Sequence, residues 1–194
     1  MTFSRKRNQA GQAAQQDREQ AVFEALFQTH WGRVVQVIAR LVGDPAEAED
    51  LALDAFWRLY RQPPRQDQNL AGWLYRVATR LGLNALRARR RRQRYEEAAG
   101  KDALQDDPPG NPAILFERAQ ERQQVRQVLS MMKPRAAQLL VLRHSGMSYA
   151  EIAGALDVST GSIGTLLARA EREFEQRYLK ASGSGRQEEE DASQ

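Results

Sequence analysis

The sequence contains no cysteine among its 194 residues. Disulfide frameworks and thiolate metal sites are therefore excluded. Aromatic residues make up only 7% of the chain, and no apolar run approaches the roughly 20 residues that a membrane-spanning helix needs. The N-terminal stretch MTFSRKRNQAGQ also lacks the apolar core of a signal peptide. We therefore expect a cytoplasmic protein with no membrane insertion.

Neither sign of charge dominates, since 29 lysines and arginines face 25 acidic residues and leave a net charge of +4. The distribution of charge is more informative than the sum. Basic residues gather in residues 1–18 and in residues 87–94, where six of the eight are arginine. Acidic residues gather in residues 47–54, 102–107 and 188–191. Residues 87–94 contain no acid, and such a cationic helix end favours contact with a polyanion over a merely solvated surface.

Apolar residues recur at helical spacing through most of the chain, and no alternation typical of strands appears. The sequence therefore predicts an all-α fold. The stretch GDPAE at residues 43–47 predicts a helix end at Gly43, an N-cap at Asp44 and a new helix from Pro45 to about Arg61. The prolines and polar residues of residues 62–68 predict a loop.

Composition divides the chain into two small helical domains. The segment at residues 96–111, which ends in DALQDDPPGN, has the acid, proline and glycine content of a flexible linker. We expect an N-terminal domain over residues 19–95 and a C-terminal domain over residues 112–180. The basic residues 1–18 and the acidic residues 181–194 are expected to be disordered tails.

The C-terminal domain has the pattern of a helix-turn-helix. Ser148 and Glu151 predict a capping box on a short helix, and Ser159 is the expected cap of a second helix. A helix placed in this way offers its N-terminal residues to the major groove of DNA. A helical packing unit that binds no DNA would have the same periodicity, but the context favours DNA binding. The outward residues of the second helix are Ser159, Thr160, Ser162, Thr165, Arg169 and Arg172.

The helix expected over residues 69–94 carries two different faces. Apolar side chains from Trp73 to Ala85 form one side, after a possible N-cap at Asn69. Another side carries what we call the arginine stripe, which consists of Arg76, Arg80, Asn84, Arg87 and Arg91. A helix anchored by one face and cationic on another is suited to hold a phosphate backbone.

The acidic helix leaves an enzymatic alternative open. Glu47, Asp50 and Asp54 could gather on one face and hold a divalent cation, as in all-α metal-dependent nucleotide pyrophosphatases. Such a site needs a facing acidic helix, but the neighbouring helix offers arginines. His30 and His144 lie apart from any serine or cysteine constellation. We therefore expect no catalytic residue, metal site or cofactor.

Taken in order, these segments resemble one family. The helix AEAEDLALDAFWRLYR, the helix WLYRVATRLGLNALRARRRR, the acidic linker and the segment KPRAAQLLVLRHSGMSYAEIAGALDVSTGSIGTLLARAERE are similar to extracytoplasmic-function (ECF) sigma factors of bacterial RNA polymerase. The resemblance covers residues 21–178. It implies a transcription initiation factor whose partners are core RNA polymerase, promoter DNA and an anti-sigma factor that nothing in the sequence identifies.

The resemblance also implies roles for particular residues. It places contact with a coiled coil of the largest polymerase subunit on the acidic helix, at Glu49, Asp50, Leu51, Asp54, Phe56 and Arg58. It places capture and melting of the minus-ten element on the next helix, at Asn69, Trp73, Tyr75, Arg76, Arg80, Asn84, Arg87 and Arg91. It assigns reading of the minus-thirty-five element to the six outward residues of the helix-turn-helix.

An autonomous helix-turn-helix regulator, whose N-terminal helices only dimerise, is the rival interpretation. A sigma factor needs core polymerase for specific promoter binding, whereas such a regulator does not. Co-purification with core polymerase therefore discriminates between the two.

Overall fold

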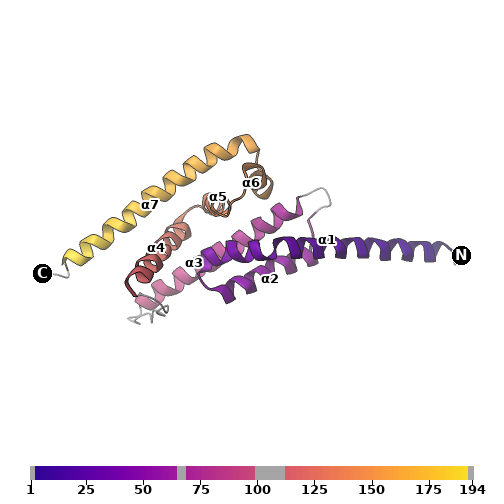
Figure 1. Ribbon diagram of the computed structural model, residues 1–194, viewed down its shortest axis with the longest axis horizontal. Helices are drawn as coiled ribbons and strands as arrows, with labels where there is room; N and C mark the ends of the chain where they lie inside the picture. The colour runs from indigo at the N-terminus through magenta and orange to yellow at the C-terminus, as the bar shows by residue number, and fades with distance from the viewer. Residues whose placement is uncertain (1–2, 65–68, 99–111, 192–194) are drawn as a thin grey trace.

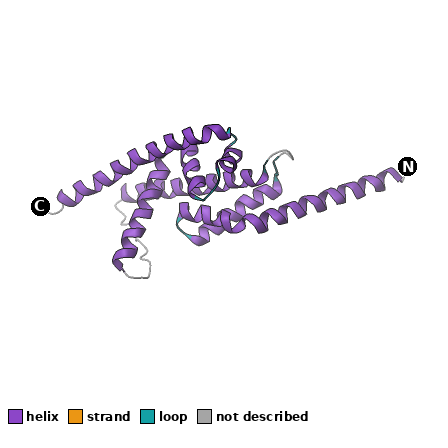
Figure 2. Ribbon diagram, turned by 45° about the horizontal axis from the view of Figure 1, so that its top comes forward, coloured by secondary structure: helices purple, strands orange, loops and turns teal. Residues whose placement is uncertain are grey.

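The computed structural model describes residues 3–64, 69–98 and 112–191. Within these ranges every regular element is helical, which confirms the all-α prediction (Figure 2). The elements are α1 (Phe3–Val42), α2 (Pro45–Arg61), α3 (Leu70–Ala98), α4 (Pro112–Met131), α5 (Pro134–His144), α6 (Tyr149–Leu156), the short 3₁₀ turn η1 (Thr160–Ser162) and α7 (Ile163–Asp191). In the described part of the chain, no helix is long and apolar enough to cross a membrane.

Helix α3 lies at the centre of the molecule. It packs with α1 and α2 into a three-helix group, and it also contacts α4, α5 and α6, so that the two groups of helices meet along it (Figure 1). Helix α7 covers α4 and α5, and the two termini lie at opposite ends of the long axis (Figure 1). Buried apolar side chains from both groups form one continuous cluster. The C-terminal helices are therefore docked on α3.

The junction between α1 and α2 has the predicted local structure. Gly43 has φ +78°, a left-handed conformation that glycine adopts at no steric cost, and its amide donates to the Ala39 carbonyl at 2.8 Å. The Asp44 carboxylate accepts a hydrogen bond from the Ala46 amide at 2.9 Å, and Pro45 begins the helix. These residues confirm the cap predicted from the sequence.

Both terminal helices are longer than the sequence prediction. Helix α1 begins at Phe3 and α7 runs to Asp191, so both segments expected to be disordered are largely helical. The reason is that Gln, Ala, Glu and Arg are good helix formers, and extending an anchored helix needs no new nucleus. Helix α3 also continues to Ala98, into the predicted linker, and the remaining linker residues 99–111 lie outside the described residues.

Candidate polymerase and nucleic-acid interfaces

Helix α2 presents an apolar stripe to solvent. Leu53, Trp57 and Tyr60 recur at helical spacing, and their exposed fractions are 51%, 57% and 59%. The Trp57 and Tyr60 rings stack with their centroids 5.9 Å apart, and the Arg61 guanidinium lies 5.7 Å from the Trp57 ring. Large exposed apolar side chains that gather in one place mark an interaction surface more often than scattered ones do. We call Leu53, Trp57 and Tyr60 the outer stripe of α2.

The charged residues predicted to contact polymerase lie beside this outer stripe. Glu49 and Asp50 are exposed, as the sequence predicted. Asp54 is half-buried, and its carboxylate accepts two hydrogen bonds from Arg58, at 2.9 and 3.0 Å, which raise the pKa of Arg58. Asp50 is therefore a free negative charge next to the outer stripe, whereas Asp54 and Arg58 largely neutralise one another.

Phe56 corrects the sequence interpretation of the same helix. Only 2% of its surface is exposed, and its ring packs between those of Phe23, Phe27 and Trp31, with centroids 6.3, 4.9 and 5.9 Å away. A residue held in this aromatic cluster cannot reach a partner. Leu51 is half-buried and packs against the core, so it too has a structural role. The sequence analysis missed Leu53, Trp57 and Tyr60, although their spacing of four and three residues marks a second apolar face.

A hollow opens where α2, α3 and α5 meet. Its volume is about 800 Å³. The lining residues are Trp57, Arg58, Arg61, Gln62, Trp73, Arg76, Val77, Arg80 and Gln138. Four of these are arginines and two are tryptophans. Planar aromatic and guanidinium groups stack on unpaired bases, and arginine also holds phosphate, so this hollow suits an extruded nucleotide.

The arginine stripe is only partly available. Arg80, Asn84 and Arg91 are exposed and Arg76 is half-buried. Arg87 donates to the backbone carbonyls of α4 instead, to Ser130 at 3.3 Å and Met132 at 3.2 Å. Burial and the nearby Arg91 lower the pKa of Arg87. In this arrangement three arginines of the stripe can meet phosphate, and Arg87 cannot.

Acid does lie near the arginine cluster, contrary to the sequence interpretation. Arg89 donates to the Val42 carbonyl at 2.8 Å and pairs with the Glu47 carboxylate at 3.1 Å. These contacts tie α3 to the end of α1 and to the start of α2, where Glu47 is forty-two residues from Arg89 in the sequence. Sequence reasoning could not find this pair, because helical periodicity gives the faces of one helix and not its distant neighbours.

Tyr75 does not lie on the predicted DNA face. It is 2% exposed, its hydroxyl lies 3.0 Å from His30 Nδ1, and the Arg33 guanidinium lies 5.5 Å from its ring. Burial raises the pKa of Tyr75 and lowers that of His30. The ring therefore cannot stack on an unpaired base. Trp73 is half-buried and lines the hollow, and Asn69 caps α3 by accepting a hydrogen bond from the Gly72 amide at 2.9 Å.

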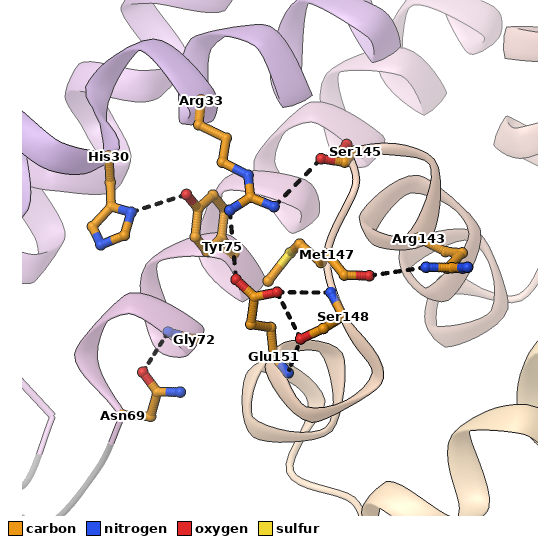
Figure 3. Close-up of polar contacts among 10 residues, drawn as sticks. All are labelled: His30, Arg33, Asn69, Gly72, Tyr75, Arg143, Ser145, Met147, Ser148 and Glu151. Atoms are coloured by element: carbon orange, nitrogen blue, oxygen red, sulfur yellow. Dashed lines mark hydrogen bonds and ion pairs between the residues drawn. The ribbon is translucent and has the colours of Figure 1, made fainter.

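The helix-turn-helix begins with the predicted capping box. The Ser148 hydroxyl accepts from the Glu151 amide, and the Glu151 carboxylate accepts from the Ser148 amide at 2.7 Å. The Ser148 hydroxyl also donates to this carboxylate at 2.7 Å (Figure 3), and the two hydrogen bonds from the Ser148 amide and hydroxyl lower the pKa of Glu151, because they favour the ionised carboxylate. The turn places Asp157 in the left-handed region at φ 55°. Helix α6 is thus fixed locally by its own sequence.

The second helix of this unit starts differently from the prediction. Ser159 makes no side-chain cap; its carbonyl accepts from the Ser162 amide at 3.1 Å, and η1 leads into α7 at Ile163. The outward face is nonetheless where it was expected. Five of the six predicted reading residues are exposed and one, Ser162, is half-buried. The five exposed residues are Ser159, Thr160, Thr165, Arg169 and Arg172.

The metal-dependent alternative finds no support in the side chains. Within the described ranges, no three histidine, aspartate or glutamate side chains are grouped so that they could hold a metal ion. Of the three carboxylates considered, Glu47 pairs with Arg89 and Asp54 pairs with Arg58. Such charge pairs leave those carboxylates neutralised by arginine.

Comparison with known proteins agrees with this architecture. Residues 26–92 match the family model for sigma-70 region 2, and residues 122–174 match that for sigma-70 region 4. The first match spans α2 and most of α3, and the second spans the helix-turn-helix. Both groups of helices therefore match regions of sigma-70 factors, region 2 before region 4 along the chain.

Several relatives are similar over most of this chain. The RNA polymerase sigma-E factor of Streptomyces avermitilis is 32% identical over 175 residues, which cover 87% of this chain and 93% of that protein. The RNA polymerase sigma-H factor of Pseudomonas aeruginosa is 28% identical, over 78% of this chain and 83% of that protein. The ECF sigma factor SigE of Mycolicibacterium smegmatis is 27% identical over 82% of this chain, which spans 63% of that relative's length. The chain therefore belongs to the ECF-type sigma factors of bacterial RNA polymerase.

Proposed function

We propose that this chain is a transcription initiation factor that binds core RNA polymerase, directs it to particular promoters and helps to melt the minus-ten element. The observation that carries the proposal is the outer stripe of α2. It exposes Leu53, Trp57 and Tyr60 beside the free carboxylate of Asp50, on the helix next to the cationic hollow. A surface of this kind suits a protein partner, and the hollow suits a nucleic-acid strand.

Sigma factors are initiation factors and not enzymes, so membership of the family excludes the pyrophosphatase alternative. It also weighs against the autonomous regulator, because the N-terminal helices match region 2 and are not a mere dimerisation unit. The same proposal places the chain in the cytoplasm, where bacterial RNA polymerase works. The expected anti-sigma factor stays a prediction of the family resemblance.

Co-purification tests the proposed function directly. Tagged full-length chain should retain core polymerase, and the complex should bind a promoter that neither component binds specifically alone. Specific promoter binding by the chain without polymerase, at the same affinity, would favour the autonomous regulator instead.

The arginine stripe should contribute to the salt dependence of promoter binding. Arg80→Gln or Arg91→Gln should each lower the slope of log K against log salt by about one unit, because each removes one phosphate contact. The loss should be similar for all promoters, since phosphate contacts position the protein and do not specify sequence. Titration of promoter DNA with the holoenzyme across a range of salt concentrations measures the slope.

Arg89→Gln is the matched control for this prediction. Arg89 lies in the same cluster but points to Val42 and Glu47, so its loss should leave the slope unchanged. Equal slopes for the wild-type chain and all three variants would assign the stripe to a solvated surface.

The helix-turn-helix should bind upstream-element duplex weakly when polymerase is absent. Its exposed reading face carries hydroxyls and only two arginines, Arg169 and Arg172, and Glu171 and Glu175 lie beside them. Single hydroxyls discriminate less than bidentate arginine contacts, which are worth about 1–3 kcal/mol per base. Tethering to polymerase would supply the missing affinity by raising the effective concentration.

Fluorescence anisotropy of the full-length chain on duplexes with every single-base change tests this prediction. Arg169→Gln should weaken binding to all duplexes, and Arg122→Gln on α4 should not. Tight binding at physiological salt, with single changes that each cost several kcal/mol, would contradict the weak-reading interpretation.

A further inference from the structure

The hollow between α2, α3 and α5 carries more positive charge than one nucleotide of a strand can neutralise. Of the described residues that line it, four are arginines and none is acidic. Arg58 is already paired with Asp54. In the part of the chain that the structure describes, the guanidinium groups of Arg61, Arg76 and Arg80 make no hydrogen bond and no ion pair. Three positive charges therefore surround one cavity without an acidic partner.

These three charges match a chain of phosphates better than a single phosphate. Each nucleotide of a strand carries one phosphate, so one extruded nucleotide brings little negative charge into the hollow. A nucleoside triphosphate joins three phosphates to one base. Arginine binds phosphate oxygens through paired hydrogen bonds that are short and strong, because donor and acceptor are both charged. The unpaired guanidinium groups could therefore each meet phosphate oxygens of one triphosphate.

Two tryptophans provide the surface for a base. Trp57 is 57% exposed and Trp73 is half-buried, and both line the hollow. The Arg61 guanidinium lies 5.7 Å from the centroid of the Trp57 ring, so a cationic group is held beside this aromatic face. Stacking on an aromatic side chain is worth about tenfold or more in affinity per base, and a purine offers the larger face. Base-binding and phosphate-binding groups thus lie side by side.

The hollow also has the size and the walls of a small-molecule site. Its volume of about 800 Å³ falls within the range of about 300–1,000 Å³ that is typical of ligand pockets. Its lining residues lie on α2, α3 and α5 or, for Gln62, at the cap that ends α2. Gln138 of α5 donates to the Arg76 carbonyl and to the Thr79 hydroxyl, both at 3.2 Å, and so fixes one wall. A site built on packed helices needs little ordering when a ligand binds.

We propose that the hollow binds a free purine nucleoside triphosphate, with its base on Trp57 and its phosphates on Arg61, Arg76 and Arg80. This inference goes beyond the proposed function, because it assigns a soluble small molecule to the hollow. A free nucleotide and a promoter strand share one chemistry, a nucleobase joined to phosphate. The two ligands therefore compete for the hollow.

Isothermal titration calorimetry of the full-length chain, without polymerase or promoter, tests this site. ATP should bind at least about tenfold more tightly than AMP, whose single phosphate is all that one unit of a strand offers. ATP should also bind about tenfold more tightly than inorganic triphosphate, which lacks the base. Equal affinities for ATP and AMP would overturn the proposal, because the hollow would then accept only a strand-like unit. Equal affinities for ATP and inorganic triphosphate would overturn it as well, because any polyanion would then suffice.

Substitutions assign the two parts of the ligand to particular side chains. Trp57→Ala should lower the affinity for ATP to that for inorganic triphosphate and leave the affinity for inorganic triphosphate unchanged. Arg61→Gln with Arg80→Gln, at two exposed positions, should weaken binding of both ligands at least about tenfold. Arg118→Gln with Arg122→Gln on α4 is the matched control, since it removes the same charge outside the hollow and should bind ATP like the wild-type chain. Equal losses in the two arginine pairs would assign binding to the overall charge of the chain and overturn the proposal.

A competition measurement shows whether strand and nucleotide share the hollow. ATP should displace a labelled promoter-strand oligonucleotide from the complex of the chain with core polymerase, and AMP at the same concentration should not; failure of ATP to displace the strand would contradict a shared site. The inference and the proposed function can fail separately. If the chain binds polymerase and promoter but calorimetry detects no ATP binding, only the ligand assignment is wrong. If ATP binds as expected to a chain that does not bind polymerase, the triphosphate site stands and the proposed function is wrong.

Discussion

A charge reversal at Asp50, combined with a charged substitution at Leu53 in the outer stripe of α2, should abolish association with core polymerase. Asp50→Arg reverses the negative charge beside the outer stripe. Leu53→Glu replaces an apolar contact of the stripe with a negative charge. Truncating a hot-spot residue of an interface costs about 2 kcal/mol or more, which is about 30-fold in affinity, so we expect the double variant to bind at least about 30-fold more weakly. Titration of labelled chain with purified core polymerase measures the change.

The fold should not suffer from this change, because Asp50 is exposed and half of the Leu53 surface already faces solvent. A matched control is Glu175→Arg with Leu179→Glu, which makes the same two changes on the exposed side of α7. That control should bind polymerase like the wild-type chain. If the α2 variant keeps its helicity and still binds polymerase with unchanged affinity, the docking assignment is wrong.

Two adjacent aromatic residues of α2 should behave in opposite ways. Phe56→Ala removes a ring that is 2% exposed and contacts three other rings, so it should cost about 3–5 kcal/mol of unfolding free energy. In a chain of this length that corresponds to a fall in melting temperature of about 10 °C. Thermal unfolding followed by circular dichroism measures it.

Trp57→Ala removes a ring that is 57% exposed, and it should change the melting temperature by no more than about 2 °C. Its effect should appear in polymerase binding, which a folded Trp57→Ala chain should lose in part. Equal losses of stability in the two variants would contradict the division of α2 into a core face and an outer stripe.

Local sequence signals predicted the elements that depend on neighbouring residues. The cap at Asp44, the left-handed Gly43 and the capping box of Ser148 and Glu151 each involve residues within four positions of one another. The exposed reading face of the helix-turn-helix followed from helical periodicity in the same way. Such features are set by short-range physics, so the sequence alone predicts them.

Features that depend on distant packing were not predicted. Tyr75 has the spacing of a surface residue beside the arginine stripe, but α1 brings His30 and Arg33 against it. Arg87 and Arg89 look alike in the sequence, and only the fold shows that one faces α4 and the other Glu47. The position of α6 on α3 depends on Gly72 and Gly154, eighty-two residues apart, and no periodicity connects them.

Run-off transcription with purified core polymerase tests the central claim most directly. The chain, added to core enzyme on a genomic promoter library, should produce discrete transcripts that neither component makes alone. The Asp50→Arg, Leu53→Glu variant should produce none, because it no longer binds core polymerase. Transcripts that do not depend on the chain, or a complete absence of transcripts from a chain that binds core polymerase normally, would contradict the account.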